Sequence, residues 1–229
     1  MIKIERVVTP SPEQWEAIIR GMRNPMNSWD KSDSVICKGA DGFEDCTVSA
    51  VGECPRHEDF RHDIFCVGAA DLTLMEKLAE AGTDHRKFMR MIPVFMDITA
   101  PLYWWKEYDT YKVGTVASSC STMHKIHSKE FTTDDFSCEL LSIPARQQLR
   151  NTIKFLEKRR QEYNQTKDIR CWNDMVQLLP TSYNQMRTAT LNYEVLKNMY
   201  RARKNHKLME WREFCERIEK LPYSNLITG

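Results

Sequence analysis

The residues best suited to chemistry lie near the end of the sequence, in the stretch Arg-Lys-Asn-His-Lys-Leu-Met-Glu-Trp-Arg at 203–212. On a helix, Arg203, His206 and Arg212 can project toward neighbouring parts of one face, with Glu210 beside them to orient the cations. Grouped donors of this kind suit an anionic ligand such as a nucleotide phosphate. The alternative is a solvated helix face with ordinary ion pairs.

A second polar segment favours the interpretation as a binding site. Residues 114–125 read Gly-Thr-Val-Ala-Ser-Ser-Cys-Ser-Thr-Met-His-Lys, with few large apolar side chains, many hydroxyls and two basic residues at the end. Such a segment contributes little to a core, but its hydroxyl and amide donors can line a polar pocket. The two segments together indicate a site for an anionic ligand.

The eight cysteines are scattered without a Cys-x-x-Cys pair, which predicts reduced thiols rather than a disulfide framework in a cytosolic chain. One group suggests zinc as an alternative, because Cys46, Cys54, His57, His62 and Cys66 lie close together. Their spacing matches no standard structural zinc motif, so we predict no metal site.

Composition excludes several classes of protein. With 41% hydrophobic and 10% aromatic residues, the 229-residue chain can bury a core and is not disordered. The formal net charge of +1 gives no global field for nucleic acid, so a nucleic-acid-binding module built on the basic residues at 146–160 is the least favoured hypothesis. No apolar run approaches the ~20 residues of a membrane span, and the N-terminus lacks a signal peptide's apolar core. We expect a cytoplasmic protein that does not bind membranes.

The elements that must position these residues follow from hydrophobic periodicity and capping residues. Asp71 is expected to cap the helix that it begins, and the aromatic residues at 103–111 are expected in the core or at a subunit interface. In chain order, the predicted elements are a strand at 1–8, a helix at 13–22, an irregular stretch at 24–66, helices at 71–81 and 85–89, a strand at 92–98, helices at 145–165 and 171–179, and a long or broken helix at 183–220. We predict one domain over 1–229, with an insertion at about 24–66.

The motifs of the C-terminal half resemble those of the flavin-dependent thymidylate synthases. Leu-Pro-Thr-Ser-Tyr at 179–183 precedes Asn192, which is followed by Arg203, His206 and Glu-Trp-Arg at 210–212. The family has a Leu-Pro start, an Asn-x-Arg helix, and an Arg followed by His-Ala-Gln-x-Glu-Ile-Arg.

The resemblance continues upstream. Residues 78–85 resemble the family's helix that ends in Gly-His-x-Ser, and residues 98–125 resemble its helix, Arg-His-Arg-x-x-Ser motif and following polar strand. In all, the resemblance covers about residues 70–125 and 178–221, in the same order and with comparable gaps.

The chain also departs from the family pattern. Thr110, Tyr111 and Lys112 stand where the family has Arg-His-Arg, and Thr115 stands at the motif serine. Glu194 replaces the arginine of the Asn-x-Arg helix. Since those arginines touch flavin and nucleotide phosphates in the family, and lysine lacks the bidentate fork of arginine, these departures bear directly on ligand binding.

The resemblance implies a fold, a reaction and an assembly. The fold is α+β, a central mixed or antiparallel sheet flanked by helices with a long helical C-terminal half. The protein would be a homotetramer with active sites between subunits. It would use FAD, reduced by NADPH, to pass a one-carbon unit from methylenetetrahydrofolate to C5 of dUMP or a related pyrimidine deoxynucleotide.

The resemblance also assigns roles by position. Arg212 would be the catalytic residue, lying against the pyrimidine and favouring its ionised form. The substrate-binding residues would be Ser119, Ser121, Lys125, Arg187 and Arg212. The cofactor-binding residues would be His85, Lys112, Thr115, Asn192, Arg203 and His206. The main alternative is a non-catalytic relative that binds or senses a nucleotide and has lost flavin chemistry.

Overall fold

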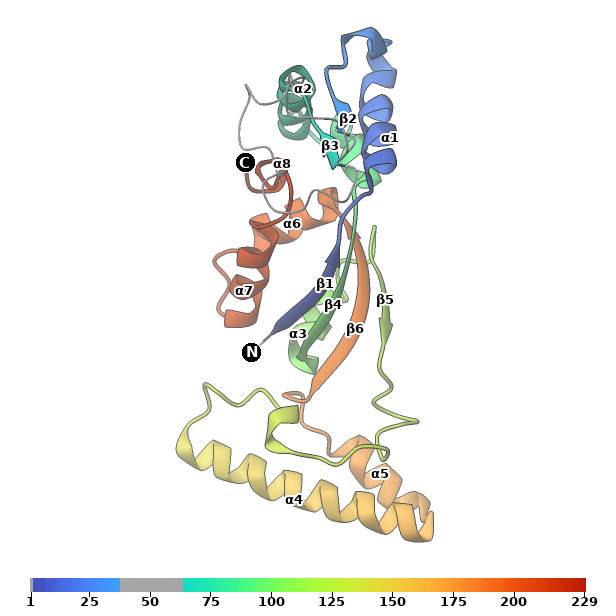
Figure 1. Cartoon of the computed structure of the whole chain (residues 1–229). Coiled ribbons are helices and arrows are strands. Elements are labelled where there is room, and N and C mark those ends of the chain that lie inside the picture. The colour runs from blue at the N-terminus through green and yellow to red at the C-terminus, as the bar shows by residue number, and fades with distance from the viewer. Residues whose placement is uncertain (1, 38–63) are drawn as a thin grey trace.

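The structure is a computed structural model that describes residues 2–37 and 64–229. Its main sheet has four strands in the order β1-β4-β6-β5, and neighbouring strands run antiparallel (Figure 1). The strands are β1 (Lys3–Val8), β4 (Pro93–Pro101), β5 (Val116–Ser119) and β6 (Asn184–Asn192). The predicted α+β class, with a central antiparallel sheet flanked by helices, is confirmed.

Helices lie at both ends of this sheet and along it. Figure 1 places α1 and α2 beyond one end of the sheet, and α4 and α5 beyond the opposite end. The α-helices are α1 (Pro12–Arg23), α2 (Ala69–Glu80), α3 (Leu102–Tyr108), α4 (Ile143–Thr166), α5 (Ile169–Gln177), α6 (Tyr193–Arg203), α7 (Met209–Ile218) and α8 (Asn225–Thr228). Short 3-10 helices occur at η1 (Asn24–Met26), η2 (Trp29–Lys31), η6 (Arg86–Met91) and η7 (Thr133–Asp135).

The main core joins α3 to α7. Trp104 and Trp105 of α3 and Trp211 and Phe214 of α7 are almost completely buried. The ring centre of Trp104 lies 4.6 Å from that of Trp211 and 5.6 Å from that of Phe214. Aromatic rings packed at these separations hold the two helices in a fixed relation. The sequence analysis offered two locations for the aromatic residues at 103–111, the core or a subunit interface. Trp104 and Trp105 lie in the core.

A second hydrophobic cluster lies at the α4–α5 end of the molecule. Leu149, Ile153 and Leu156 of α4 pack with Met175 of α5 and with apolar residues of the segment 126–136. Their spacing of three and four residues places them on one face of α4. The basic residues Arg146, Arg150, Lys154 and Lys158 of the same helix are exposed. This cluster supports the chain segment that follows β5.

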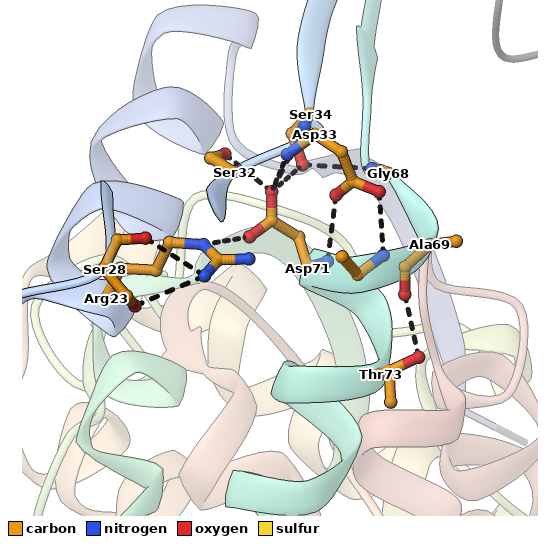
Figure 2. A network of polar contacts seen from close by, with 10 residues as sticks. Arg23, Ser28, Ser32, Asp33, Ser34, Gly68, Ala69, Asp71 and Thr73 are labelled. Atoms are coloured by element: carbon orange, nitrogen blue, oxygen red, sulfur yellow. Dashed lines mark hydrogen bonds and ion pairs between the residues drawn. The ribbon is translucent and has the colours of Figure 1, made fainter. Parts of the chain in front are cut away.

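Two short strands form a separate pair beside α1. β2 (Val35–Cys37) is antiparallel to β3 (Ile64–Cys66). Figure 2 shows the polar network at the base of this pair, where the buried Asp71 carboxylate accepts hydrogen bonds from Arg23, Ser32 and Ser34. The predicted irregular stretch at 24–66 thus contains ordered elements at both of its ends.

Two local predictions were wrong. β6 occupies residues that were assigned to the long C-terminal helix, which begins only at Tyr193 and is broken between α6 and α7. Asp71 does not cap α2, because Gly68 is the N-cap residue and the Asp71 side chain turns inward to Arg23. The backbone N–H groups of Ala70 and Asp71 are instead accepted by the Asp33 carboxylate.

In the part of the chain that the structure describes, no helix combines the length and the apolar character needed to cross a membrane.

Candidate functional site

A pocket of about 580 Å³ opens where the segment after β5 meets the ends of β4 and β6. Ser121 and Lys125, which were predicted to hold a nucleotide phosphate, both line it. Gln185 of β6 and Asp135 of η7 line other parts of the wall. The pocket has the size and the mixed lining of a small-molecule site.

Backbone contacts fix the wall that carries Ser121. The Cys120 N–H donates to the Met186 carbonyl at 3.0 Å, and the Gln185 side-chain amide donates to the Cys120 carbonyl at 2.7 Å. The Ser121 hydroxyl oxygen accepts the N–H groups of Met123 and His124 at 3.3 and 3.0 Å. This turn holds the Ser121 oxygen in place while its proton stays able to reach a ligand oxygen.

Lys125 is the cation at this pocket that remains available to an anion. Its side chain is exposed, and the described residues offer it no ion pair. The neighbouring Lys129 is bound to Asp135, and that hydrogen bond raises the pKa of the Lys129 ammonium. Lys125 is therefore a pocket-lining cation that has no ion pair among the described residues.

Arg187 lies next to the pocket and opposite Ser119. The two residues are direct cross-strand partners of β6 and β5. The Arg187 guanidinium donates to Asp109 at 2.8 Å and to the Gln185 side-chain oxygen at 3.0 Å, and it lies 4.2 Å from the centre of the Trp105 ring. Because Gln185 also binds the Cys120 carbonyl, Arg187 is connected to the pocket wall through one amide side chain.

Arg203 and His206 converge on a carboxylate that the sequence analysis did not single out. Glu107 accepts from Arg203 at 2.7 Å and from the Trp211 indole N–H at 2.9 Å, and its oxygen lies 3.5 Å from the His206 Nε2. The Arg203 guanidinium also lies 4.9 Å from the centre of the Trp211 ring. The predicted pair does come together, but Glu107 and not Glu210 orients it.

Arg212 is exposed on α7 and does not line the pocket that contains Ser121. Glu210 is buried and accepts a hydrogen bond from the Tyr103 hydroxyl. Burial and the Glu210 charge raise the pKa of Tyr103, so the phenol keeps its proton. Within one chain, the three predicted cationic residues are therefore separated. Arg203 and His206 lie at Glu107, whereas Arg212 is exposed on α7.

The remaining predicted cofactor residues occupy the region where β6 enters α6. Asn192 is the N-cap of α6, accepting the Val195 N–H at 3.0 Å, and its amide lies 3.5 Å from the Gly114 carbonyl. The Thr115 hydroxyl donates to the Tyr111 carbonyl. Lys112 is exposed nearby, whereas His85 is exposed at the start of η6.

Glu194, which stands where the resemblance expects arginine, is buried in a double ion pair. Its carboxylate is bound by Arg86 at 3.3 Å and by Arg90. The position at which the resemblance expects an arginine thus carries a carboxylate, and two arginines of η6 bind it. No sequence pattern indicated this exchange, because the partners are far apart along the chain.

Of the five residues in the sequence-based zinc hypothesis, the structure describes Cys66. Cys46, Cys54, His57 and His62 lie outside the described residues. In residues 2–37 and 64–229, no group of three or more His, Cys, Asp or Glu side chains is placed to hold a metal ion.

Comparison with known proteins relates the chain to solved structures. No protein-family model and no curated protein matches it. The flavin-dependent thymidylate synthase ThyX from Helicobacter pylori, complexed with FAD and dUMP, matches with a TM-score of 0.63 over 99% of this chain and 96% of that chain, at 14% identity. A second structure of the Helicobacter pylori enzyme with FAD and dUMP gives a TM-score of 0.60 over 99% and 95% of the two chains, at 13% identity. At this identity the likeness establishes the shared fold.

Proposed function

We propose that the chain binds dUMP or a related pyrimidine deoxynucleotide in the pocket after β5 and transfers a one-carbon unit from methylenetetrahydrofolate to C5 of its base. One observation carries the proposal: Ser121 and Lys125, assigned to the nucleotide phosphate by the resemblance, line a single pocket of about 580 Å³. The likeness of the whole fold to a protein complexed with FAD and dUMP supports this choice of ligand.

The pocket residues have separable roles in this proposal. Lys125 neutralises the phosphate, and the Ser121 hydroxyl donates to one of its oxygens. Ser119 and Arg187 extend the polar wall along the sheet, where Asp109 and Gln185 fix the direction of the guanidinium. A residue held by two such contacts keeps its geometry when substrate enters.

Arg212 completes the site from another subunit. It lies outside the pocket of its own chain, and the resemblance to a homotetramer with sites between subunits provides the partner. Placed against the pyrimidine, its fixed charge lowers the energy of negative charge on the ring.

The residues between α3 and α6 fit a flavin nucleotide. Lys112 is an exposed cation, and Thr115 and Asn192 lie close to it in the same region. Arg203, which pairs with Glu107 as His206 does, also donates to the hydroxyl of Tyr111, and the Tyr111 carbonyl accepts from Thr115. FAD held there and reduced by NADPH would supply the hydride that completes the methyl group.

A non-catalytic nucleotide-binding or sensing protein is the second candidate, and a specific observation favours it. Glu194 takes the place of an expected arginine and is held by Arg86 and Arg90, and Arg203 is held by Glu107. These pairs reduce the positive charge offered to a flavin pyrophosphate. The nucleotide pocket does not depend on any of these residues.

Two measurements test the proposal. Calorimetry with dUMP should show binding, and Lys125→Ala should weaken it about ten- to hundredfold, as expected when a charged hydrogen bond worth about 1.5–3 kcal/mol is lost. Lys154→Ala, an exposed lysine of α4 outside the pocket, is the matched control. Equal affinities for wild type and Lys125→Ala would show that the nucleotide lies elsewhere.

Flavin binding then separates the two candidates. A protein that shows the yellow absorption of oxidised FAD, and that converts dUMP when NADPH and methylenetetrahydrofolate are added, is the enzyme. A protein that binds dUMP yet stays colourless after incubation with FAD is the nucleotide-binding relative.

A further inference from the structure

Two polar residues interrupt the core-facing row of the central strand β6. Gln185 and Arg187 lie at alternate positions of the strand, in the same row as the almost completely buried Ala189 and Leu191. Gln185 is only 6% exposed. A polar side chain buried in such a row costs free energy unless its groups form hydrogen bonds, so the partners of Gln185 indicate its role.

The Gln185 amide uses its two ends in opposite ways. Its oxygen accepts from the Arg187 Nε at 3.0 Å, and its nitrogen donates to the Cys120 carbonyl at 2.7 Å. Because a guanidinium can only donate and a carbonyl can only accept, one orientation of the amide satisfies both partners. Gln185 therefore connects Arg187 to Cys120 in a fixed direction.

Arg187 is itself anchored by α3. Its Nη1 donates to Asp109, the C-cap residue of α3, at 2.8 Å, and its guanidinium lies 4.2 Å from the centre of the Trp105 ring. The Trp105 indole N–H donates to the Gln185 backbone carbonyl at 2.9 Å. These contacts join α3 to β6 and give the Gln185 amide a rigid support.

The other end of the amide holds the backbone at the point where the pocket wall begins. β5 ends at Ser119, and the Cys120 N–H still pairs with the Met186 carbonyl at 3.0 Å. The Cys120 carbonyl is bound by the Gln185 side chain. Ser121 follows directly, so the amide fixes the backbone on which the pocket residue stands.

Hydrogen bonds hold the segment 120–125 more than packing does. Its residues are exposed, apart from the half-buried Thr122. The Ser121 hydroxyl accepts two N–H groups within the segment. The Met123 carbonyl accepts from the Trp172 indole N–H at 3.1 Å, which anchors the middle of the segment to α5. At the β5 end, the Gln185 amide and the Met186 carbonyl hold it to the sheet.

We propose that Gln185 is a positioning residue of the pocket, which places Cys120, and through it Ser121 and Lys125, relative to Arg187. The inference rests on the proposed function for the identity of the ligand, a pyrimidine nucleotide whose phosphate meets Ser121 and Lys125. Gln185 lines the pocket, but both ends of its amide are engaged. Its contribution to binding therefore passes through the segment 120–125.

Hydrogen exchange of the ligand-free protein tests the positioning without reference to any ligand. Gln185→Met keeps the length of the side chain and removes both hydrogen bonds. Exchange in a peptide covering 120–125 should become roughly tenfold faster, while peptides of α4 keep their rate. Thr190→Val, on the same strand but outside the pocket, is the matched control and should leave the exchange unchanged.

Two further variants examine how the amide works. The carboxylate of Gln185→Glu can still accept from Arg187 but has no proton for the Cys120 carbonyl, so the segment should exchange as fast as in Gln185→Met. Arg187→Met should loosen the segment by itself, because it removes the group that orients the amide. In the Gln185→Met background it should add less than about a twofold effect, as expected for two residues that act through one contact.

Calorimetry with dUMP connects the segment to binding. Gln185→Met should raise the Kd about tenfold, the equivalent of one hydrogen bond, whereas Thr190→Val should keep it within about twofold. Wild-type exchange of 120–125 in Gln185→Met or Gln185→Glu would overturn the proposal. Faster exchange that is uniform over the whole chain, or an unchanged Kd beside a loosened segment, would do the same. Wild-type protein that does not bind dUMP would instead refute the proposed function, and the exchange rates would then decide the positioning role by themselves.

Discussion

At the scale of single residues, Glu107 is central to the candidate site, although the sequence analysis did not identify it as a site residue. One carboxylate serves Arg203, His206 and the indole N–H of Trp211. Trp211 is 0% exposed, so its N–H has little access to water if the acceptor is removed. The arrangement of the cationic pair therefore depends on α3, although both cations belong to the C-terminal segment.

We predict that Glu107→Ala lowers the free energy of unfolding by about 1–3 kcal/mol, the usual penalty for a buried donor left without a partner. The neighbouring Lys106→Ala, which removes an exposed side chain, should change it by less than about 0.5 kcal/mol. Urea unfolding of both variants checks this. Equal stability of Glu107→Ala and wild type would show that water replaces the carboxylate at Trp211.

Unlike the Trp211 indole N–H, the Tyr108 hydroxyl lacks a hydrogen-bond partner among the described residues. Its oxygen is buried, and burial raises the pKa of the phenol. Removing an unsatisfied polar atom removes a desolvation cost of about 1–3 kcal/mol. We predict that Tyr108→Phe leaves stability unchanged or raises it, as measured by thermal unfolding. A clear loss would mean that the hydroxyl binds a group, such as ordered water, which the phenylalanine cannot replace.

At the scale of elements, the Asp71 network determines how α1, α2 and the β2–β3 pair meet. Asp71 and Arg23 have side chains that are 0% and 5% exposed. Desolvation by burial raises the pKa of Asp71, but hydrogen bonds from Ser34, Ser32 and Arg23 outweigh it and leave the pKa below its ordinary value of 3.8. The carboxylate is thus more stable as an anion in the folded chain than in the unfolded chain.

We predict that Asp71→Asn destabilises the fold by about 3–5 kcal/mol, because it leaves the buried Arg23 charge without its partner. Asp30→Asn, at an exposed position of the same segment, is the matched control. Since a lowered pKa contributes stability above the unfolded value and loses it on protonation, the gap between wild type and Asp71→Asn should narrow as the pH falls below 3.8. A gap that is constant from neutral to acid pH would contradict the role of the charge.

The sequence predicted some elements correctly and missed others. The apolar stripe of Trp15, Ile18, Ile19 and Met22 predicted α1 to within a residue at each end, because one helix buries one stripe. β6 was missed for a physical reason. Its core-facing row, at every second residue, includes the polar Gln185 and Arg187 besides Ala189 and Leu191, so the sequence shows no clean apolar alternation.

In the candidate site, too, the sequence predicted some residues and missed others. Ser121 and Lys125 were found together because they lie four residues apart on one segment, and so were Arg203 and His206. The carboxylates that hold the cations were not found, because Glu107 lies 96 positions from Arg203 and Asp109 lies 78 positions from Arg187. Such contacts depend on the strand order and not on any local pattern.

At the scale of the whole molecule, the predicted site residues lie in two regions. The pocket with Ser121 lies where the segment after β5 meets the ends of β4 and β6, next to the α4–α5 unit, whereas α7 packs on α3 on the side of β1 (Figure 1). The pocket lies at the ends of the two central strands, β4 and β6, and Arg212 is not among the residues that line it. In the proposed function, Arg212 therefore reaches a nucleotide in this pocket from a second copy of the chain.

This geometry makes a quantitative prediction about mixed assemblies. Arg212→Ala and Lys125→Ala should each lose high-affinity dUMP binding as homo-oligomers. If each pocket takes its Arg212 from a different subunit, random mixing of the two variants by co-expression restores both residues in about one quarter of the sites, since each half is intact with a probability of about one half. Calorimetry of the mixed protein would count those sites.

Mixing after separate purification, without subunit exchange, is the control and should restore none. If co-expression also restores none, while the wild-type chain binds dUMP, then Arg212 and Lys125 act within one chain or at different ligands, and the shared site between subunits is excluded.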